Sequence, residues 1–252
     1  MNTLLLNADS NADLALCGSW LKAGKLVAVP TETVYGLAAD ASNPDAVSAI
    51  FTAKRRPANH PLIVHLYDKK AINDWACKIS TAAYALAEAF WPGPLTLLLH
   101  KAAHVSPIVT GGLNTIALRM PSHPLLLKLM QQHQLALAAP SANLYKKLSP
   151  TSAAHVVAGM QGKITAVLDG GDCQFGVEST IIDFTQPSRL LYAQVQSLQH
   201  KSKPYLAGQL RSRVSIMLWC RAMSVPIINQ RNRYYALAVK SCWCIYQSRS
   251  SR

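Results

Sequence analysis

Hydroxyl, carboxylate and cationic side chains follow an apolar run early in the sequence. The apolar residues Leu26–Val29 are followed by Pro30 and then by the polar residues Thr31–Thr33. Lys54 and Arg56 come further along the sequence. A short apolar run that ends at a proline predicts a strand, and ligands of open α/β sheets bind beyond strand ends. Cations beside hydroxyls are typical of phosphate sites. Because Thr and Glu also begin helices, an ordinary turn fits the spacing equally well.

Three more polar clusters lie beside apolar runs. Arg119 follows Thr115–Leu118, Pro140–Asn143 follows Leu135–Ala139, and Gly176–Ser179 precedes another apolar run. Each cluster alone is typical of a solvated charge, a helix cap or a turn. Their recurrence, with cations and neutral donors together, predicts an anion-binding pocket where several strand ends meet at one rim of a sheet.

Strand and helix patterns alternate through the first 186 residues. The predicted strands are 26–29, 62–66, 95–99, 115–118, 136–139, 166–169 and 180–184, and the predicted helices are 44–54, 81–90, 123–133 and about 152–160. This alternation favours an α/β domain around a twisted, mixed sheet.

Charge divides the chain into two parts. Residues 1–186 carry 14 Lys+Arg and 12 Asp+Glu, a net of +2, whereas residues 187–252 carry 11 Lys+Arg and no acid, a net of +11. Overall basicity therefore does not indicate nucleic-acid binding by the first part. No apolar run approaches the length of a membrane span, and the cysteines show no paired metal-ligand spacing. We expect a cytoplasmic protein without membrane contact.

Seven motifs stand in a fixed order along the chain. They are Pro30–Gly36, Lys54-x-Arg56-Pro57, Pro61-Leu62, Trp91–Thr96, Arg119-x-Pro121, Pro140–Asn143 and Glu178–Ile181. Together they resemble the YrdC-like domain of threonylcarbamoyl-AMP synthases of the TsaC type, over about residues 8–190. The resemblance implies an α/β fold with a twisted, mixed or antiparallel open sheet, flanked by helices, and a basic concave ligand face.

The resemblance also implies an ATP-dependent nucleotidyltransferase. It would join L-threonine, bicarbonate or CO2, and ATP into threonylcarbamoyl-AMP with release of pyrophosphate. The product would pass to a transferase complex that makes threonylcarbamoyladenosine in tRNA, and contact with tRNA or another RNA is a further expectation. Magnesium would be carried by the ATP phosphates, and no other metal is assigned. A carbamate oxygen must attack the α-phosphorus, so the chemistry needs cations and donors more than a strong acid or nucleophile.

Residue roles follow from the matched motifs. Lys54 and Arg56 would bind the triphosphate and serve as the catalytic cations, and the remaining nucleotide contacts would come from Thr115, Ser141, Asn143 and Ser149. Threonine and its carbamate would be held by Thr31, His65, Arg119 and Ser179. His65 lies in an apolar run, where a core histidine is the more frequent case, and the motif context favours a functional one. We assign Trp91–Pro94 to packing.

The sequence departs from the family after Arg189–Leu191. Family members continue there with another arginine, which contacts the nucleotide, and then Pro-Gly, whereas Tyr192–Gln194 follows here. We therefore predict a YrdC-like catalytic domain at residues 1–191 and a basic tail at 192–252, disordered or poorly packed. A nucleic-acid-binding extension and an altered reading frame both explain this tail, and we favour the second.

Two classes of function stay open from the sequence. The synthase is the favoured one, and the alternative is a non-catalytic RNA-binding or ribosome-associated module with the same fold. Threonine recognition separates the two, since an RNA-binding module needs Lys54 and Arg56 but has no use for a threonine site.

Overall fold

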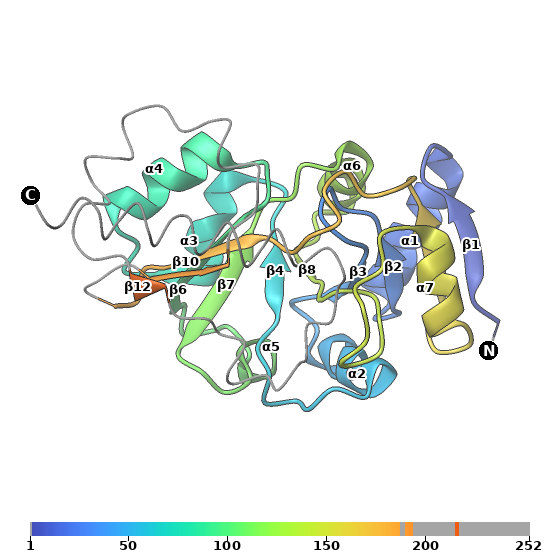
Figure 1. Ribbon diagram of the computed structural model, residues 1–252, viewed down its shortest axis with the longest axis horizontal. Coiled ribbons are helices and arrows are strands. Elements are labelled where there is room, and N and C mark those ends of the chain that lie inside the picture. Colours follow the sequence, from blue (N-terminus) through green and yellow to red (C-terminus); the bar gives the residue numbers. More distant parts are fainter. Residues whose placement is uncertain (1, 187–189, 194–214, 217–252) are drawn as a thin grey trace, which may run out of the picture. The chain divides into compact units, whose positions relative to one another are not determined.

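A computed structural model describes residues 2–186, 190–193 and 215–216 (Figure 1). Every described residue belongs to one unit of the chain, Met1–Leu218. The helices are α1 (Asn11–Lys22), α2 (Pro44–Lys54), η1 (Lys69–Ala71), α3 (Ile72–Trp75), α4 (Thr81–Phe90), α5 (Pro107–Thr110), α6 (Pro124–His133) and α7 (Ala153–Met160). The strands are β1 (Leu4–Asn7), β2 (Val27–Val29), β3 (Gly36–Asp40), β4 (Ile63–His65), β5 (Ala76–Cys77), β6 (Leu95–Lys101), β7 (Thr115–Arg119), β8 (Leu137–Ala138), β9 (Ala166–Asp169), β10 (Thr180–Asp183), β11 (Leu190–Ala193) and β12 (Ser215–Ile216).

These strands form a hydrogen-bonded sheet in the order β1-β9-β2-β3-β8-β4-β7-β6-β10-β11-β12, with β5 paired to β6. Parallel pairs such as β4 with β7 alternate with antiparallel pairs such as β4 with β8 and β6 with β7. The predicted mixed α/β fold is therefore confirmed. The predicted basic concave face stays a prediction. Among the described residues, no helix has the length and apolar character that crossing a membrane requires.

Helices cover both faces of the part of the sheet around β2, β3 and β9. Val27 and Val29 pack with α1 and α6 in one apolar cluster, whereas Ala28 between them packs with α2 and α7 in a second. Successive strand residues point to opposite faces, so an uninterrupted apolar run such as Val27–Val29 fits a strand that is buried on both faces.

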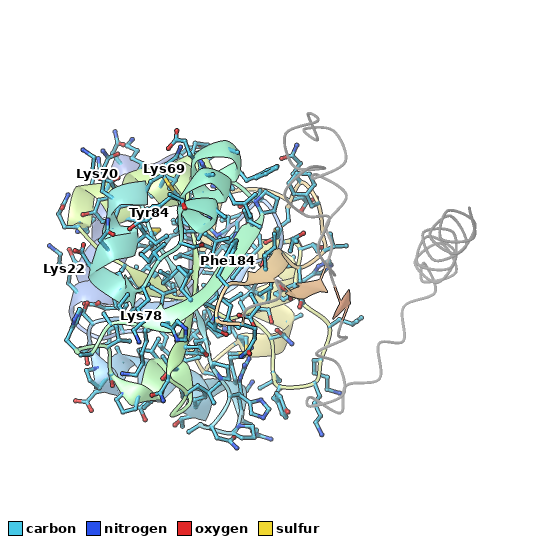
Figure 2. All side chains as sticks on the ribbon, turned by 90° about the vertical axis from the view of Figure 1, so that its left-hand side faces the viewer. Lys22, Lys69, Lys70, Lys78, Tyr84 and Phe184 are labelled. Atoms are coloured by element: carbon cyan, nitrogen blue, oxygen red, sulfur yellow. The ribbon has the colours of Figure 1, made fainter. Side chains whose placement is uncertain are left out.

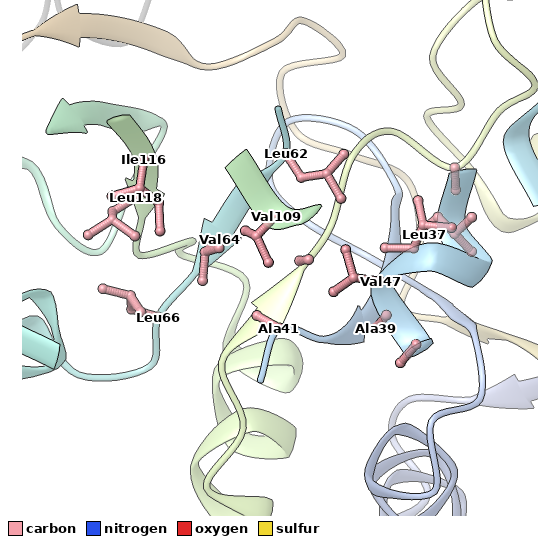
Figure 3. Close-up of a cluster of buried hydrophobic side chains, with 14 of the residues drawn as sticks. Leu37, Ala39, Ala41, Val47, Leu62, Val64, Leu66, Val109, Ile116 and Leu118 are labelled. Carbon is pink, nitrogen blue, oxygen red and sulfur yellow. The ribbon is translucent and has the colours of Figure 1, made fainter. Parts of the chain in front are cut away.

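Around β4, β7 and β6 the two faces of the sheet differ. Val64, Leu97 and Leu118 belong to the apolar cluster that includes residues of α3, α4 and α5, and part of this cluster is drawn in Figure 3. On the other face lie His65, Thr96 and Arg119, each next in sequence to one of these residues, together with apolar neighbours such as Ile63. This face carries the candidate site.

Several lysines lie on the outer surface of the molecule, beyond the helices that cover the apolar face of the sheet. Lys69, Lys70 and Lys78 lie near Tyr84 of α4 on one side of the molecule (Figure 2). Lys69 of η1 forms an ion pair of 2.9 Å with Glu88 of α4, and its side chain is 32% exposed. Exposed pairs of this kind contribute little to stability, and we assign these lysines to the solvated outer surface.

Helix ends agree closely with the sequence pattern where caps are strong. The bounds of α2 and α4 match the prediction, because Asn43 accepts hydrogen bonds from the amides of Asp45 and Ala46, and Ser80 caps α4 in the same manner. The sequence analysis did not predict β1, α1 or β3. The strand β3 has the sequence Gly-Leu-Ala-Ala-Asp, and glycine and alanine are uncommon in strands, so its residue types do not predict one.

The predicted tail lies mostly outside the described residues. The strand β11 pairs with β10 and crosses the predicted boundary between residues 191 and 192, and the two-residue strand β12 pairs with β11. The division into domain and tail stays a prediction.

Candidate active site

A row of polar side chains crosses three neighbouring strands on one face of the sheet. Strand register places His65 opposite Arg119, and Arg119 opposite Thr96. Residues paired in register point to the same face, and their neighbours Val64, Leu118 and Leu97 fill the apolar cluster behind. Ser179 joins the row at the start of β10, where its hydroxyl lies 2.8 Å from that of Thr96. Three of the four predicted threonine-site residues are therefore brought together.

Arg119 is the charged centre of this row and is 3% exposed. Its Nε donates to the carbonyl of Gly93 over 3.3 Å, and its Nη1 donates to the hydroxyl of Thr33 over 3.0 Å. Its Nη2 lies 2.6 Å from Oε1 of Glu32, and this carboxylate is also buried. A buried charge is costly unless it is paired, and the ion pair with Glu32 meets this requirement.

His65 is buried beside Arg119 without a hydrogen-bond partner for either ring nitrogen among the described residues. Burial lowers the pKa of His65 to about 3, and the positive charge of Arg119 acts in the same direction. The ring is therefore neutral at physiological pH, with one nitrogen that donates and one that accepts. A core histidine held by backbone groups does not match this environment, whereas a histidine that awaits a polar ligand does.

The segment between β2 and β3 brings Glu32 and Thr33 to Arg119. The hydroxyl of Thr31 donates to the carbonyl of Val34 over 2.6 Å and accepts from the amides of Thr33 and Val34 at 3.1 Å. These bonds close the turn, so Thr31 stabilises the loop, as the turn interpretation of the sequence expects. Thr31 reaches the row only through Thr33, whose hydroxyl lies 3.0 Å away.

Lys54 holds the loop that follows β8. Its ammonium donates to the carbonyl of Ser141, to the carbonyl of Asn143 over 2.6 Å and to the side-chain oxygen of Asn143 at 3.5 Å. Burial lowers the pKa of Lys54 to about 7; Arg56 lowers it further and Glu178 opposes the shift. A polyphosphate beside this ammonium would favour its charged form and raise the pKa again.

Arg56 stands on the turn after α2. Arg55 has a left-handed backbone with φ of 52° that ends the helix, and Arg56 then donates from Nη2 to the carbonyl of Pro61 over 3.0 Å. Its Nε is buried without a hydrogen-bond partner among the described residues. Arg56 therefore retains a donor for a ligand, whereas the donors of Lys54 contact the protein.

The other predicted nucleotide residues lie on loops around Lys54. Asn143 closes its own loop by donating to the carbonyls of Leu144 and Lys147, at 2.9 and 2.7 Å. Ser149 donates to the carboxylate of Glu178 over 2.7 Å. Thr115 is half-buried at the start of β7, paired with His100. Glu178 directly precedes Ser179, so this short segment contacts both predicted sets of residues.

The expectation that the strand ends meet at one rim is wrong. Strand β7 runs parallel to β4, and β8 runs antiparallel to it, so the chain leaves β8 toward Ser141 at the edge where β7 begins. Arg119 lies at the other end of β7. The predicted nucleotide and threonine residues are therefore separated along the central strands, and Thr115 and Arg119 are about 13 Å apart at 3.3 Å per residue.

Three residues of this site had no role in the sequence analysis. Glu32 and Thr33 belong to a motif that the analysis singled out, but their contact with Arg119 joins segments far apart in the chain. Thr96 ends the motif Trp91–Thr96, of which we assigned Trp91–Pro94 to packing. The polar residue within the otherwise apolar run Leu95–Leu99 was the available signal. Among the described residues, no group of three or more His, Cys, Asp or Glu side chains could hold a metal ion.

The sequence matches the model of a known protein family. Residues 19–192 match the family model of the Sua5, YciO and YrdC proteins, which carries the description "Telomere recombination". The chain belongs to this family, and the resemblance inferred from the seven motifs is confirmed.

Several relatives are nearly half identical to this chain over the residues that align. Over 187 residues it is 46% identical to a threonylcarbamoyl-AMP synthase of Pyrococcus abyssi, covering 73% of this chain and 55% of the relative. Over 176 residues it is 47% identical to the enzyme of the same name from Bacillus subtilis, covering 69% of this chain and 51% of the relative. The chain thus spans about half the length of these curated relatives.

Solved structures show the same fold. The structure of P. abyssi Sua5 complexed with L-threonine aligns with a TM-score of 0.78 at 40% identity, covering 86% of this chain and 63% of that one. Escherichia coli YciO aligns with a TM-score of 0.68 at 17% identity, and the alignment covers 78% of this chain and 97% of YciO. The second likeness concerns the fold alone.

The buried neutral His65 predicts a specific loss of stability in acid. The pKa of His65 is about 3 in the folded protein, whereas its ordinary value, which applies to the unfolded chain, is 6.5. Between these two pH values the unfolded chain therefore binds more protons than the folded protein. The contribution of His65 to the free energy of unfolding is fully present above pH 6.5 and decreases as the pH falls. By pH 5 the loss from this residue alone is about 2 kcal/mol. Urea unfolding at pH 6.5 and 5.0 should show a smaller loss in His65→Gln than in the unmodified chain. Equal losses in both proteins would contradict a buried neutral imidazole.

Proposed function

We propose that this chain catalyses the formation of threonylcarbamoyl-AMP from L-threonine, bicarbonate or CO2, and ATP, with release of pyrophosphate. The observation that carries the proposal is the buried polar row on one sheet face, where Arg119, His65 and Ser179 present charge and hydrogen-bonding groups beside one another. The enzyme name of the curated relatives and the threonine complex of P. abyssi Sua5 support the same reaction.

The row suits the amino-acid end of the reaction. Arg119 would bind the threonine carboxylate, because a guanidinium offers several donors to a carboxylate. Neutral His65 would pair with the threonine hydroxyl, since the imidazole can donate or accept. Ser179 and its partner Thr96 would add hydroxyl contacts to the carboxylate or the carbamate.

The other end of the central strands suits the nucleotide. Arg56 offers an unpartnered buried donor to the phosphates, and Lys54 adds charge while it fixes the loop of Ser141 and Asn143. The carbamate oxygen would attack the α-phosphorus, the bond to the pyrophosphate would break, and these cations would stabilise charge on the phosphate oxygens. Ser149 and Thr115 would complete the nucleotide contacts.

Other expectations from the sequence belong to this proposal. Magnesium bound to the ATP phosphates would neutralise part of their charge. Bicarbonate as the carbon source, delivery of the product to a tRNA-modifying transferase complex, contact with tRNA and a cytoplasmic location also remain proposals. The non-catalytic RNA-binding alternative is not favoured, because the curated relatives carry the name of an enzyme.

The reaction itself predicts a strict dependence on three substrates. The purified full chain, with magnesium present, should release pyrophosphate from ATP only when both L-threonine and bicarbonate are added. Leaving out each component in turn is the measurement. Release of pyrophosphate at the same rate without threonine would contradict the proposal.

The contacts of the two cations predict different results for their variants. Arg56→Gln should lower ATP affinity by roughly 10- to 100-fold, the range expected for one charge-assisted hydrogen bond, with a small effect on stability. Lys54→Met should also weaken ATP binding, and in addition it should lower the free energy of unfolding by about 1–3 kcal/mol because buried carbonyls lose their donor.

Calorimetric ATP titration and urea unfolding measure both quantities. Arg55→Gln is the matched control, because this neighbouring cation is exposed and should leave ATP affinity near that of the unmodified chain. Unchanged ATP affinity in both Arg56→Gln and Lys54→Met would show that these cations only stabilise the fold.

A further inference from the structure

The centre of the polar row contains several buried polar atoms without hydrogen-bond partners. Within the described part of the chain they are Oε2 of Glu32 and both ring nitrogens of His65, whereas Oε1 of Glu32 and Nη2 of Arg119 contact each other in the ion pair. Glu32 is 4% exposed and His65 and Arg119 are 3% exposed. Buried polar groups without partners are rare in folded proteins and indicate a ligand or a catalytic role. Their position beside one another indicates one ligand with both donors and acceptors.

Glu32 is held firmly at this position. Its backbone carbonyl accepts from the amide of Phe175 over 2.9 Å, and the next carbonyl, of Thr33, accepts from Gly176 over 3.0 Å. The hydroxyl of Thr31 closes the same turn from inside. The backbone that carries Glu32 is therefore fixed on both sides of this residue, and the ion pair with Arg119 orients its carboxylate.

The ion pair with Arg119 does not use the full capacity of the Glu32 carboxylate. Oε1 lies 2.6 Å from Nη2 of Arg119, whereas Oε2 is buried without a hydrogen-bond partner among the described residues. A carboxylate accepts about four hydrogen bonds. The other ionisable groups near Glu32 are His123, at the start of α6, and Cys173, and both respond to its negative charge.

The charges on Glu32 and Arg119 match those of an α-amino acid. A zwitterion adds no net charge to the buried pair, places its carboxylate on the cation and offers three N–H donors to the anion. ATP and bicarbonate are anions whose donors carry no positive charge, and their negative charge is repelled by Glu32. Of the three proposed substrates, the amino acid alone has a cationic donor for this carboxylate.

We propose that Glu32 binds the α-ammonium group of the amino-acid substrate and takes a proton from it as the carbamate forms. The assignment rests on the proposed function and names a residue for its first chemical step. Glu32 accepts one N–H proton, and the nitrogen lone pair forms the N–C bond with CO2 while one C–O π bond becomes a carboxylate. The second proton leaves the nitrogen to water, which gives a neutral Glu32 beside the carbamate anion.

The transfer of a proton from the ammonium group to Glu32 also favours formation of the carbamate. An ionised Glu32 attracts the ammonium, but it would repel a carbamate at the same nitrogen. Transfer of the proton to Glu32 removes that repulsion at the moment when the negative carbamate appears. The same carboxylate can therefore bind the substrate and tolerate the intermediate.

Two ligands that differ at one group test the assignment. L-Threonine and the 2,3-dihydroxybutanoate of the same configuration share the carboxylate and the side chain, but the second has a hydroxyl in place of the ammonium. Calorimetric titration of the full chain should show threonine binding roughly 10- to 100-fold more tightly, as expected for a charge-assisted contact. In Glu32→Gln, threonine affinity should fall to about that of the hydroxy acid, and the hydroxy acid should bind as before.

The same titrations distinguish ammonium binding from support of Arg119. If Glu32 only positions Arg119, Glu32→Gln weakens both ligands by the same factor, because both need Arg119 for their carboxylates, and this result overturns the proposal. Asp172→Asn is the matched control, an exposed carboxylate on the segment that contacts the Glu32 loop, and it should preserve the preference for threonine.

The unmodified chain alone provides a second test, so the proposal does not depend on the folding of Glu32→Gln. Equal affinity for threonine and the hydroxy acid would overturn the role of Glu32 and leave the proposed function intact. No binding of threonine at all would overturn the proposed function and the assignment together. A preference for threonine that is abolished in Glu32→Gln supports both.

Discussion

Arg119 carries a buried charge, and its pairing with Glu32 makes the rest of the site possible. Each charge alone would be costly away from water, whereas the pair is neutral and can remain buried beside the apolar strands. The pairing requires the segment after β2 to pass over the sheet, and the turn closed by Thr31 gives that segment its shape. Hydroxyls of Thr33, Thr96 and Ser179 then surround the pair.

Strand direction is the second constraint on the site. Because β8 runs antiparallel to β4 while β7 runs parallel to it, the loop that Lys54 holds lies at the opposite end of the central strands from Arg119. The proposed reaction joins an amino acid to a nucleotide, and such separation would place one charged substrate group at each end with the reacting centre between them. Glu178 and Ser179 are adjacent and contact one set each.

Local features of the site could be predicted from the sequence, and contacts between distant segments could not. The bounds of α2 follow from its cap and its proline, and the motif order identifies His65, Arg119 and Ser179. The use of Lys54 to hold Ser141 and Asn143 depends on how the chain returns after β8. The role of Glu32 depends likewise on its pairing with Arg119. The strand β3 escaped prediction because Gly36, Ala38 and Ala39 have little intrinsic preference for strands, so the short apolar run does not identify one.

A crystal structure of the full chain with bound L-threonine tests the central claim most directly, namely that the buried Glu32–Arg119 pair is the amino-acid end of the site. Our account predicts the threonine carboxylate within hydrogen-bonding distance of Arg119, with its ammonium group facing Glu32 and its hydroxyl beside His65. Threonine bound at the Lys54 end of the strands, or with its ammonium directed away from Glu32, would contradict it.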